Sequence, residues 1–204
     1  MTLNLHNFVP WSRANGPGER AVVWVQGCPR ACPGCFNPDS QAFTPRETAT
    51  VEELETRIAA IEEIDGVTFS GGEPFAQATE LAGLARRLRK RGLTVVVYTG
   101  YTLEELRNGD RDDWNALLGE TDLLIDGPFI QSERCHEPYR GSQNQRLHFL
   151  SGRIRQEAIR EPQTAELTLD VSGSCTTTGF PDYPDAAEVF AAATGCPKHG
   201  NSEA

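Results

Sequence analysis

The sequence predicts an α/β fold in which helices cover a parallel sheet, arranged as an open, partial βα barrel. Short apolar runs alternate with amphipathic helical patterns along the chain, which is typical of βαβ units. The chain has 204 residues, enough for one domain with a core but too few for the eight repeats of a closed barrel. Polar or glycine-rich segments follow the expected strands, as they do at the ligand-binding rim of such sheets.

The first half of the chain supplies two expected strands and two expected helices. The strand over 21–25 leads directly into a loop with three cysteines. Thr50 and Glu53 then form a capping box, which begins a helix with an apolar face made of Val51, Leu54, Ile58 and Ile61. A short strand over 67–69 is followed by a second helix over 77–91, and Gly92 is its expected stop.

The second half continues the alternation. A β-branched strand is expected over 93–98, and a second capping box at Thr102 begins a helical region that extends to Gly119. Further strands are expected over 123–125 and 147–150, and after Pro162 a strand pair (167–171 and 176–180) and a short alanine-rich helix. The loops expected at the carboxyl ends of the first four strands, and therefore at one rim, are the cysteine loop, 71–74, 99–100 and 126–127.

The cysteine loop is the strongest indication of chemistry. Cys28, Cys32 and Cys35 have the spacing C-x3-C-x2-C. Three thiolates can bind one metal centre and leave a coordination position open, which in an iron–sulfur cubane is a free iron. A structural zinc site is the competing interpretation, but it usually requires a second ligand pair, and none lies near Cys35. The glycines and prolines of the loop favour exposed amides that point at cluster sulfurs, so we favour an open iron–sulfur site.

The composition limits the possible functions. A net charge of −10 argues against a nucleic-acid-binding protein, and the basic run over 86–91 is expected to decorate the carboxyl end of a helix. We find no apolar run that could span a bilayer and no signal-peptide pattern, so no membrane association is expected. Six cysteines in a chain of this length indicate a reduced, cytoplasmic setting.

The ordered motifs between about residues 15 and 150 resemble a known family. They are Gly16-Pro17-Gly18-Glu19-Arg20, Trp24-Val25-Gln26-Gly27-Cys28-Pro29, Pro33-Gly34-Cys35-Phe36-Asn37-Pro38, Thr68-Phe69-Ser70-Gly71-Gly72-Glu73-Pro74, Tyr98-Thr99-Gly100-Tyr101, Asp126-Gly127-Pro128-Phe129 and Arg140-Gly141-Ser142-Gln143-Asn144-Gln145-Arg146. The cysteine loop resembles that of radical S-adenosylmethionine (SAM) enzymes. The whole set resembles the activating enzymes of glycyl-radical proteins, above all those of anaerobic ribonucleotide reductase.

The resemblance implies a fold, a division of the chain and an activity. The fold is the partial barrel of the radical SAM type, with a core over 1–160. Outside the range of the resemblance, the sequence itself predicts a C-terminal hairpin-and-helix extension over 161–204 that packs on the same domain and ends in a mobile tail. The implied activity is reductive cleavage of SAM at one 4Fe-4S cluster. This gives a 5′-deoxyadenosyl radical, which abstracts hydrogen from a glycine of a glycyl-radical partner protein. The implied electron donor is a flavodoxin or ferredoxin.

The resemblance also assigns roles to residues. Cys28, Cys32 and Cys35 would hold the cluster and act through it. The backbone at Gly34 and Phe36 would meet adenine, and the methionine end of SAM would be held by Gly71, Gly72 and Glu73, with contributions from Thr99 and Asp126. Asn144 and Arg146 would contact the cofactor or the partner.

Structural interpretations remain open beside these roles. Gly71 and Gly72 could form only a turn, and Thr99 and Asp126 could be helix caps. The segment over 140–146 could be a solvated loop. Two other functions also remain: a radical SAM enzyme acting on a small molecule or peptide, and an iron–sulfur or zinc module without SAM chemistry. The three further cysteines have no assigned role, and we interpret them as isolated thiols rather than a second metal site: Cys135, Cys175 and Cys196.

Overall fold

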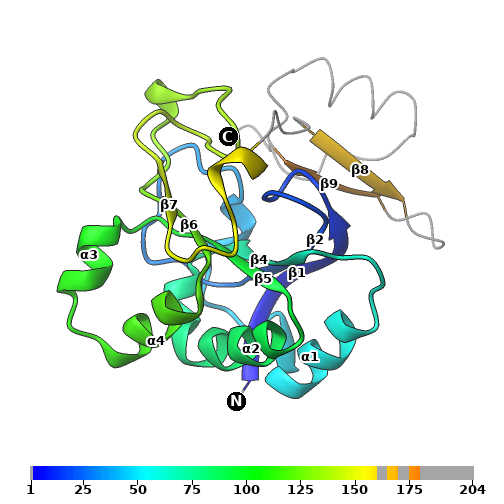
Figure 1. The fold of residues 1–204 in the computed structure, drawn as a ribbon. Coiled ribbons are helices and arrows are strands. Elements are labelled where there is room, and N and C mark those ends of the chain that lie inside the picture. The colour runs from blue at the N-terminus through cyan, green and yellow to red at the C-terminus, as the bar shows by residue number, and fades with distance from the viewer. Residues whose placement is uncertain (1, 160–164, 170–174, 180–204) are drawn as a thin grey trace.

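A computed structural model describes residues 2–159, 165–169 and 175–179 of the protein (Figure 1). These residues form a mixed α/β fold with one seven-stranded open sheet and a separate two-stranded hairpin. The strand order in the large sheet is β3-β1-β2-β4-β5-β6-β7. Its strands are β1 (Thr2–Ser12), β2 (Arg20–Val25), β3 (Glu47–Thr50), β4 (Gly66–Gly71), β5 (Thr94–Tyr98), β6 (Leu123–Asp126) and β7 (Arg146–Phe149).

The centre of the sheet is parallel, as the sequence predicts, but its flanks are not. Strands β2, β4, β5 and β6 pair in parallel. On one side β1 pairs antiparallel with β2 and with β3, and neither β1 nor β3 was expected. On the other side β7 pairs antiparallel with β6. A parallel partner for β6 would need a long crossover, usually a helix, whereas the segment between β6 and β7 contains only one short 3-10 turn, at Gln131–Glu133.

Four α-helices are described: α1 (Val51–Ala59), α2 (Ala78–Lys90), α3 (Leu103–Asn108) and α4 (Asp112–Glu120). Both capping boxes are confirmed, because the Thr50 and Thr102 hydroxyls accept from the third helical amide of α1 and α3. Gly92 follows α2 with a φ of 91°, as expected for a glycine stop. The helical region after Thr102 is divided in two, because the chain turns at Asp110, where φ is 47°. The basic residues of the last turn of α2 confirm the interpretation of that run.

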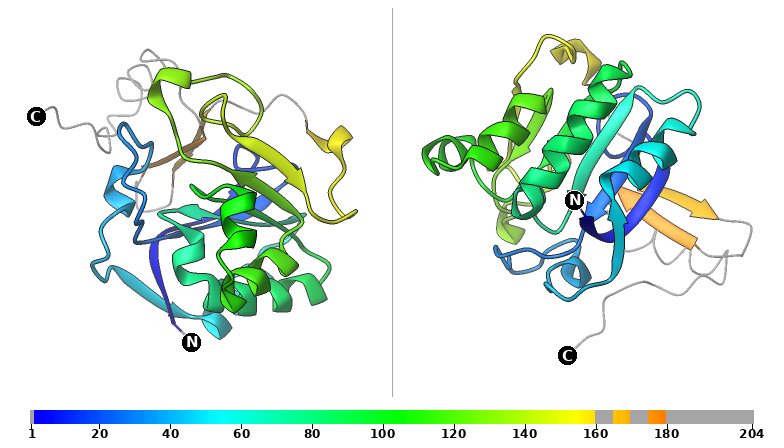
Figure 2. Two further views of the ribbon diagram at one scale, coloured as in Figure 1. Left: turned by 90° about the vertical axis from the view of Figure 1, so that its left-hand side faces the viewer. Right: turned by 90° about the horizontal axis from the view of Figure 1, so that it is seen from below.

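The helices cover one face of the sheet, where α2 lies between α1 and α4 (Figures 1 and 2). Alternate strand residues bury their side chains against them: Leu3, Leu5, Val23, Val25, Phe69, Val95, Val97 and Leu124. On the opposite face, Tyr139 and Ile154 pack against Val96, Leu123 and Ile125. Both faces of the central strands are therefore buried, which explains why those strands read as continuous apolar runs.

The expected C-terminal strand pair is present as β8 (Ala165–Leu169) and β9 (Cys175–Gly179). The hairpin is joined to the end of β1, because the carboxylate of Glu166 accepts from the Ser12 hydroxyl and from the Arg13 amide. Asn15 donates to the Thr178 hydroxyl at 2.7 Å. The expected alanine-rich helix and Cys196 lie outside the described residues. In the described part of the chain, no helix is long and apolar enough to cross a bilayer.

Candidate functional site

The four loops expected to meet at one rim do so. Parallel pairing aligns Val25 of β2 with Gly71 of β4, and Tyr98 of β5 with Ile125 of β6. Because the strands run in the same direction and end at nearly the same level, the segments that follow them begin side by side. The described site is built from these four segments.

The cysteine loop carries three free thiols, and none of them forms a disulfide. Cys28, Cys32 and Cys35 are each partly exposed. The backbone amides of Arg30 and Ala31 are directed toward the sulfur of Cys28, and the Asn37 amide donates to Sγ of Cys35 at 3.4 Å. Burial raises the pKa of the Cys28 thiol, and these amides act against that rise. Amides directed at sulfur are the feature the sequence predicted for this loop.

The thiols of the cysteine loop could serve as the ligands of an iron–sulfur cubane. Among the residues that the structure describes, no group of three or more His, Cys, Asp or Glu side chains converges to hold one metal ion. In a cubane each cysteine binds a different iron of one compact cluster. Three thiols on one loop, with amides directed at two of the sulfurs, therefore fit a 4Fe-4S cluster with one iron left without a cysteine.

The base of the cysteine loop is held by a segment that the sequence analysis did not single out. The amide of Gly27 donates to the Ser40 carbonyl at 2.7 Å, and the amide of Cys28 donates to the Gln41 carbonyl at 2.9 Å. Gln26 is buried, and its side-chain amide donates to the Ala42 carbonyl at 2.7 Å. These bonds fix the direction in which the chain leaves β2.

The segment after β4 is packed directly on the cysteine loop. The Gly72 amide donates to the Val25 carbonyl at 2.8 Å, and the Glu73 amide donates to the Gly27 carbonyl at 2.9 Å. A Cβ atom on Gly72 would lie 2.4 Å from the Gly27 carbonyl oxygen. Gly71 has a φ of 96°, which favours glycine. The two glycines therefore form a tight turn and also allow a close backbone approach.

The carboxylate of Glu73 points into the protein. It is fully buried and accepts hydrogen bonds from the Phe75 amide, the Thr99 hydroxyl and the Gly100 amide, each at 2.9 Å. Burial raises the pKa of Glu73 to about 7, although these three donors act in the opposite direction. Pro74 begins the 3-10 turn Pro74–Gln77, as a first-turn proline would. Glu73 and Thr99 thus join the loops after β4 and β5.

Asp126, at the end of β6, is also turned inward. Its buried Oδ2 accepts from the amide of Leu103, the first residue of α3, at 2.7 Å. Arg146 donates to the same oxygen at 3.0 Å, and Nε2 of His148 lies 2.9 Å from it. Arg146 also pairs with Glu104 and lowers the pKa of that carboxyl to about 2. In these contacts Asp126 and Arg146 anchor the start of α3.

Asn144 supports the loop after β6. Its side-chain amide donates to the Pro128 carbonyl at 2.8 Å, and its Oδ1 accepts from the Ser142 hydroxyl at 2.7 Å. The neighbouring Gln145 donates to the Gly127 carbonyl at 3.0 Å. The segment over 140–146 is therefore an internal brace in this structure rather than a solvated loop.

The far side of the cysteine loop meets the loop after β6. Gly34 has a φ of 70°, and a Cβ atom there would lie 2.5 Å from Oε1 of Gln131. The ring of Phe36 lies 4.5 Å from the ring of Phe129, centroid to centroid, and the Arg134 guanidinium stacks on the Phe36 ring at 5.0 Å. Gln131 and Arg134 were not singled out from the sequence, because nothing in their local pattern marks a long-range contact.

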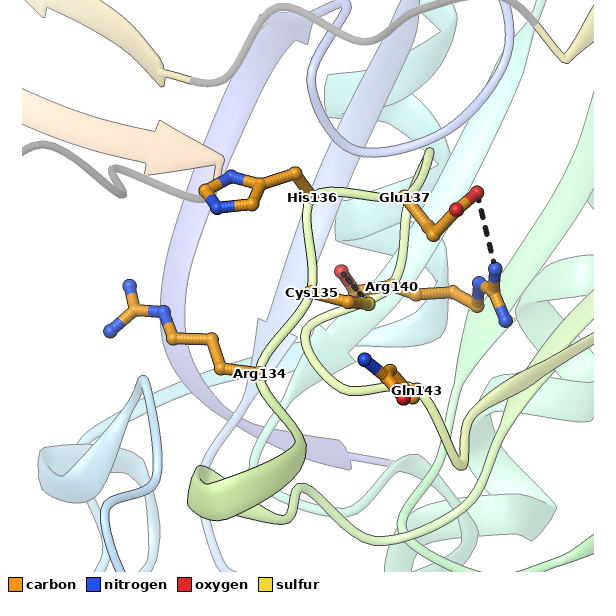
Figure 3. A pocket seen from close by; sticks show the side chains of 6 residues that line it. All are labelled: Arg134, Cys135, His136, Glu137, Arg140 and Gln143. Atoms are coloured by element: carbon orange, nitrogen blue, oxygen red, sulfur yellow. Dashed lines mark hydrogen bonds and ion pairs between the residues drawn. The ribbon is translucent and has the colours of Figure 1, made fainter.

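A cavity of about 430 Å³ continues from Arg134 along this loop (Figure 3). The residues that line it are Arg134, Cys135, His136, Glu137, Arg140 and Gln143. Arg140 forms an ion pair with Glu137 at 3.3 Å. The thiol of Cys135 is buried and donates to the Arg140 carbonyl at 3.8 Å, so this cysteine is separate from the three in the cysteine loop.

Comparison with known proteins agrees with this geometry. Residues 14–148 match the model of a family described as a 4Fe-4S single cluster domain. The chain is 33% identical over 157 residues to the anaerobic ribonucleoside-triphosphate reductase-activating protein of Vibrio cholerae, a match that covers 72% of this chain and 97% of the relative. The protein of the same name from Escherichia coli K12 is 32% identical over 163 residues, and the match covers 72% and 99%. The chain belongs to this family of activating proteins.

Membership of the activating-protein family confirms the resemblance drawn from the motifs. It also confirms the expected class of enzyme, a radical SAM oxidoreductase of the glycyl-radical-activating type. A protein of the same name from phage T4 is 30% identical to this chain over 155 residues. The match covers 71% of this chain and 93% of the phage protein. Among solved structures, QueE of Escherichia coli is similar over 50% of this chain and 54% of its own, with 20% identity and a TM-score of 0.43. The region that matches the 4Fe-4S family contains all four rim loops.

Proposed function

We propose that this protein activates an anaerobic ribonucleotide reductase by generating a radical from SAM at a 4Fe-4S cluster. The observation that carries the proposal is the cysteine loop, with three free thiols and amides directed at two of the sulfurs. This loop lies at the carboxyl rim of the parallel strands, in a chain that matches activating proteins over nearly their whole length. The alternatives, a small-molecule radical SAM enzyme and a module without SAM chemistry, are left as outcomes of the test.

The cluster would be held by Cys28, Cys32 and Cys35, which leaves one iron for the amino and carboxylate groups of SAM. When reduced, such a cluster supplies one electron to the sulfonium, which yields methionine and a 5′-deoxyadenosyl radical that takes a hydrogen atom from the partner's glycine. The protein's contribution is to bind, orient and shield these groups. The electron would come from a flavodoxin or ferredoxin.

The rim loops would position SAM mainly through their backbone. Gly71 and Gly72 lack side chains, so peptide groups there can approach the methionine moiety closely. Glu73 and Thr99 would keep that backbone in place, because their side chains are bonded to one another and to the loops. Asp126 would act in the same way by anchoring α3.

The remaining site residues would act at the periphery. The backbone at Gly34 and Phe36 would meet the adenine. Arg146 is half exposed and Asn144 lies in the brace after β6, so this edge of the rim is the expected place of contact with cofactor or partner.

The same proposal extends to the architecture. We infer that the seven-stranded sheet is a partial βα barrel of the radical SAM type, with residues 1–160 as its core. The contacts of Glu166 with Ser12 and Arg13 support a C-terminal extension that packs on the same domain. A sheet that stays open at its edges leaves space for a loop of a protein partner.

The test is anaerobic reconstitution of the protein, followed by measurement of its iron content and of 5′-deoxyadenosine release with dithionite and SAM. Alanine variants of Cys28, Cys32 and Cys35 should lose the cluster, whereas Cys135→Ala should retain it. A change in the electron paramagnetic resonance spectrum on adding SAM would show contact at the open iron. A loaded protein that never releases 5′-deoxyadenosine would contradict the proposal.

The partner is tested separately. Mixing the reconstituted protein and SAM with an anaerobic ribonucleotide reductase should produce a glycyl-radical signal in the reductase. Release of 5′-deoxyadenosine without that signal would favour a small-molecule or peptide substrate.

A further inference from the structure

Arg30 lies between the first two cysteines, and its side chain extends across the rim instead of into solvent. Its guanidinium carbon lies 4.9 Å from the centroid of the Tyr101 ring, and Nη1 lies 3.5 Å from the carboxylate of Glu105. Its Cγ atom is packed on Gly100, where a Cβ would approach it to 3.0 Å. The side chain is 26% exposed. Arg30 therefore joins the cysteine loop to the loop after β5.

The backbone of the same residue contacts a proposed cluster ligand. The amides of Arg30 and Ala31 are directed toward the sulfur of Cys28. Ala31 has a φ of 45°, a left-handed conformation that is uncommon for alanine and must be held by its surroundings. Arg30 directly precedes Ala31, so its side-chain contacts hold the chain beside this strained residue.

The surface that receives Arg30 is itself firmly held. Tyr101 also packs on the ring of Trp114, with centroids 4.8 Å apart, and the indole of Trp114 donates to the Phe75 carbonyl at 2.9 Å. The Tyr101 carbonyl accepts from the Gly127 amide at 2.9 Å. Gly100 is bonded to Glu73. Through Tyr101 and Gly100, Arg30 links the cysteine loop to the loops after β4, β5 and β6.

Arg30 also places a positive charge on the rim, beside the loop that would hold the cluster. Reduction adds one negative charge to a cluster, and a fixed cation nearby stabilises the reduced form. Glu105, the ion-pair partner, is 47% exposed, so water screens its opposing charge more than that of the less exposed guanidinium.

We propose that Arg30 is a positioning residue that clamps the cysteine loop against Tyr101 and, by its charge, favours reduction of the bound cluster. The charge effect rests on the proposed function, whereas the clamp is a property of the protein without its cluster. The two parts are therefore tested in different states of the protein.

The clamp is tested by amide hydrogen exchange in the reduced, metal-free protein. Loss of a partly exposed cation–π contact in Arg30→Gln should speed exchange at residues 30–32 by roughly two- to fivefold. Tyr101→Leu and Arg30→Lys should do the same, because the planar stack is lost in both. Arg57→Gln is the matched control. Arg57 lies on α1, away from the cysteines, where it stacks on the Phe8 ring at 4.6 Å and pairs with Glu47 at 2.8 Å.

The charge effect is tested by a redox titration of the reconstituted protein followed by electron paramagnetic resonance. Arg30→Gln should lower the reduction equilibrium constant about tenfold, which is about 59 mV for one electron. Arg30→Lys and Arg57→Gln should remain close to the parent protein. Equal exchange rates in Arg30→Gln and Arg57→Gln, or equal midpoint potentials, would overturn the proposal. Failure to bind any cluster would instead contradict the proposed function.

Discussion

The carboxylate of Glu73, after β4, accepts a hydrogen bond from the hydroxyl of Thr99, after β5, with 2.9 Å between the oxygens. Both residues were expected to hold the methionine end of SAM, and in this structure their side chains hold each other. The carboxylate has no exposed surface, and the amides of Phe75 and Gly100 also donate to it. In these contacts the carboxylate fixes the shape of two adjoining loops.

Replacing Glu73 by alanine should destabilise the protein and weaken SAM binding together. The change leaves the buried Phe75 amide and Thr99 hydroxyl without an acceptor, which costs roughly 2–4 kcal/mol in the free energy of unfolding. Urea unfolding measures the first effect, and SAM titration of the reconstituted protein measures the second. The control is Glu53→Ala in the exposed capping box of α1, which should cost about 1 kcal/mol or less and leave SAM binding unchanged. A Glu73→Ala protein as stable as this control would contradict the structural role.

The raised pKa of Glu73 predicts a pH dependence of stability. Its pKa is about 7 in the folded protein and near 4.5 in the unfolded chain, so the folded state binds more protons between these values. Stability from this group is therefore full at low pH and falls by about 3 kcal/mol as pH rises from about 4.5 to 7. Glu73→Gln, which cannot ionise, should lack this fall. Free energies of unfolding of the two metal-free proteins should diverge across that window, and parallel curves would show that Glu73 titrates normally.

Gly72→Ala should be strongly disruptive although the change is one methyl group. The added carbon would lie 2.4 Å from the Gly27 carbonyl oxygen and 2.9 Å from the Ser40 carbonyl oxygen, so the cysteine loop must move. We expect a loss of roughly 1–3 kcal/mol in stability and weaker cluster retention during reconstitution. The matched control is Gly83→Ala inside α2, where no atom beyond the chain neighbours and the helix's own backbone lies within 4 Å of the new carbon. That control should gain about 0.5–1 kcal/mol, because alanine favours helix more than glycine does.

The sequence predicted the parallel centre of the fold because local signals there agree with one another. β-Branched runs, both capping boxes and Gly92 each identify an element by its own chemistry, and their order implies the rim where the motifs meet. The strand β1 was missed because its alternating pattern of buried residues is interrupted by two irregularities in pairing, between Leu5 and Asn7 and between Val9 and Ser12. The strand β3 has only four, mostly polar residues and becomes a strand by pairing with β1.

The sequence predicted which residues gather at the candidate site. It did not predict the direction in which each side chain points. Whether Glu73 faces a ligand or the interior depends on Phe75, Thr99 and Gly100, and the last two are distant in the sequence. The same holds for Asp126, whose partners include residues of α3 and β7. Gln131 and Arg134 were missed because their contacts with the cysteine loop form only when the segment after β6 folds back.

Asp126→Ala tests whether that carboxylate is a structural anchor. The side chain is fully buried, and its removal leaves the Leu103 amide at the start of α3 without its acceptor and removes the carboxylate to which the Arg146 side chain donates. We expect a loss of roughly 1–3 kcal/mol in the free energy of unfolding, measured by urea titration, since the Leu103 amide is left without its hydrogen-bond acceptor. The control is Asp113→Ala, which removes an ion pair with Arg111, 2.7 Å long, at the exposed start of α4. This change should cost less than about 1 kcal/mol. If the two variants lost equal stability, the burial of Asp126 would have no energetic consequence, and its role would have to lie in contact with the cofactor.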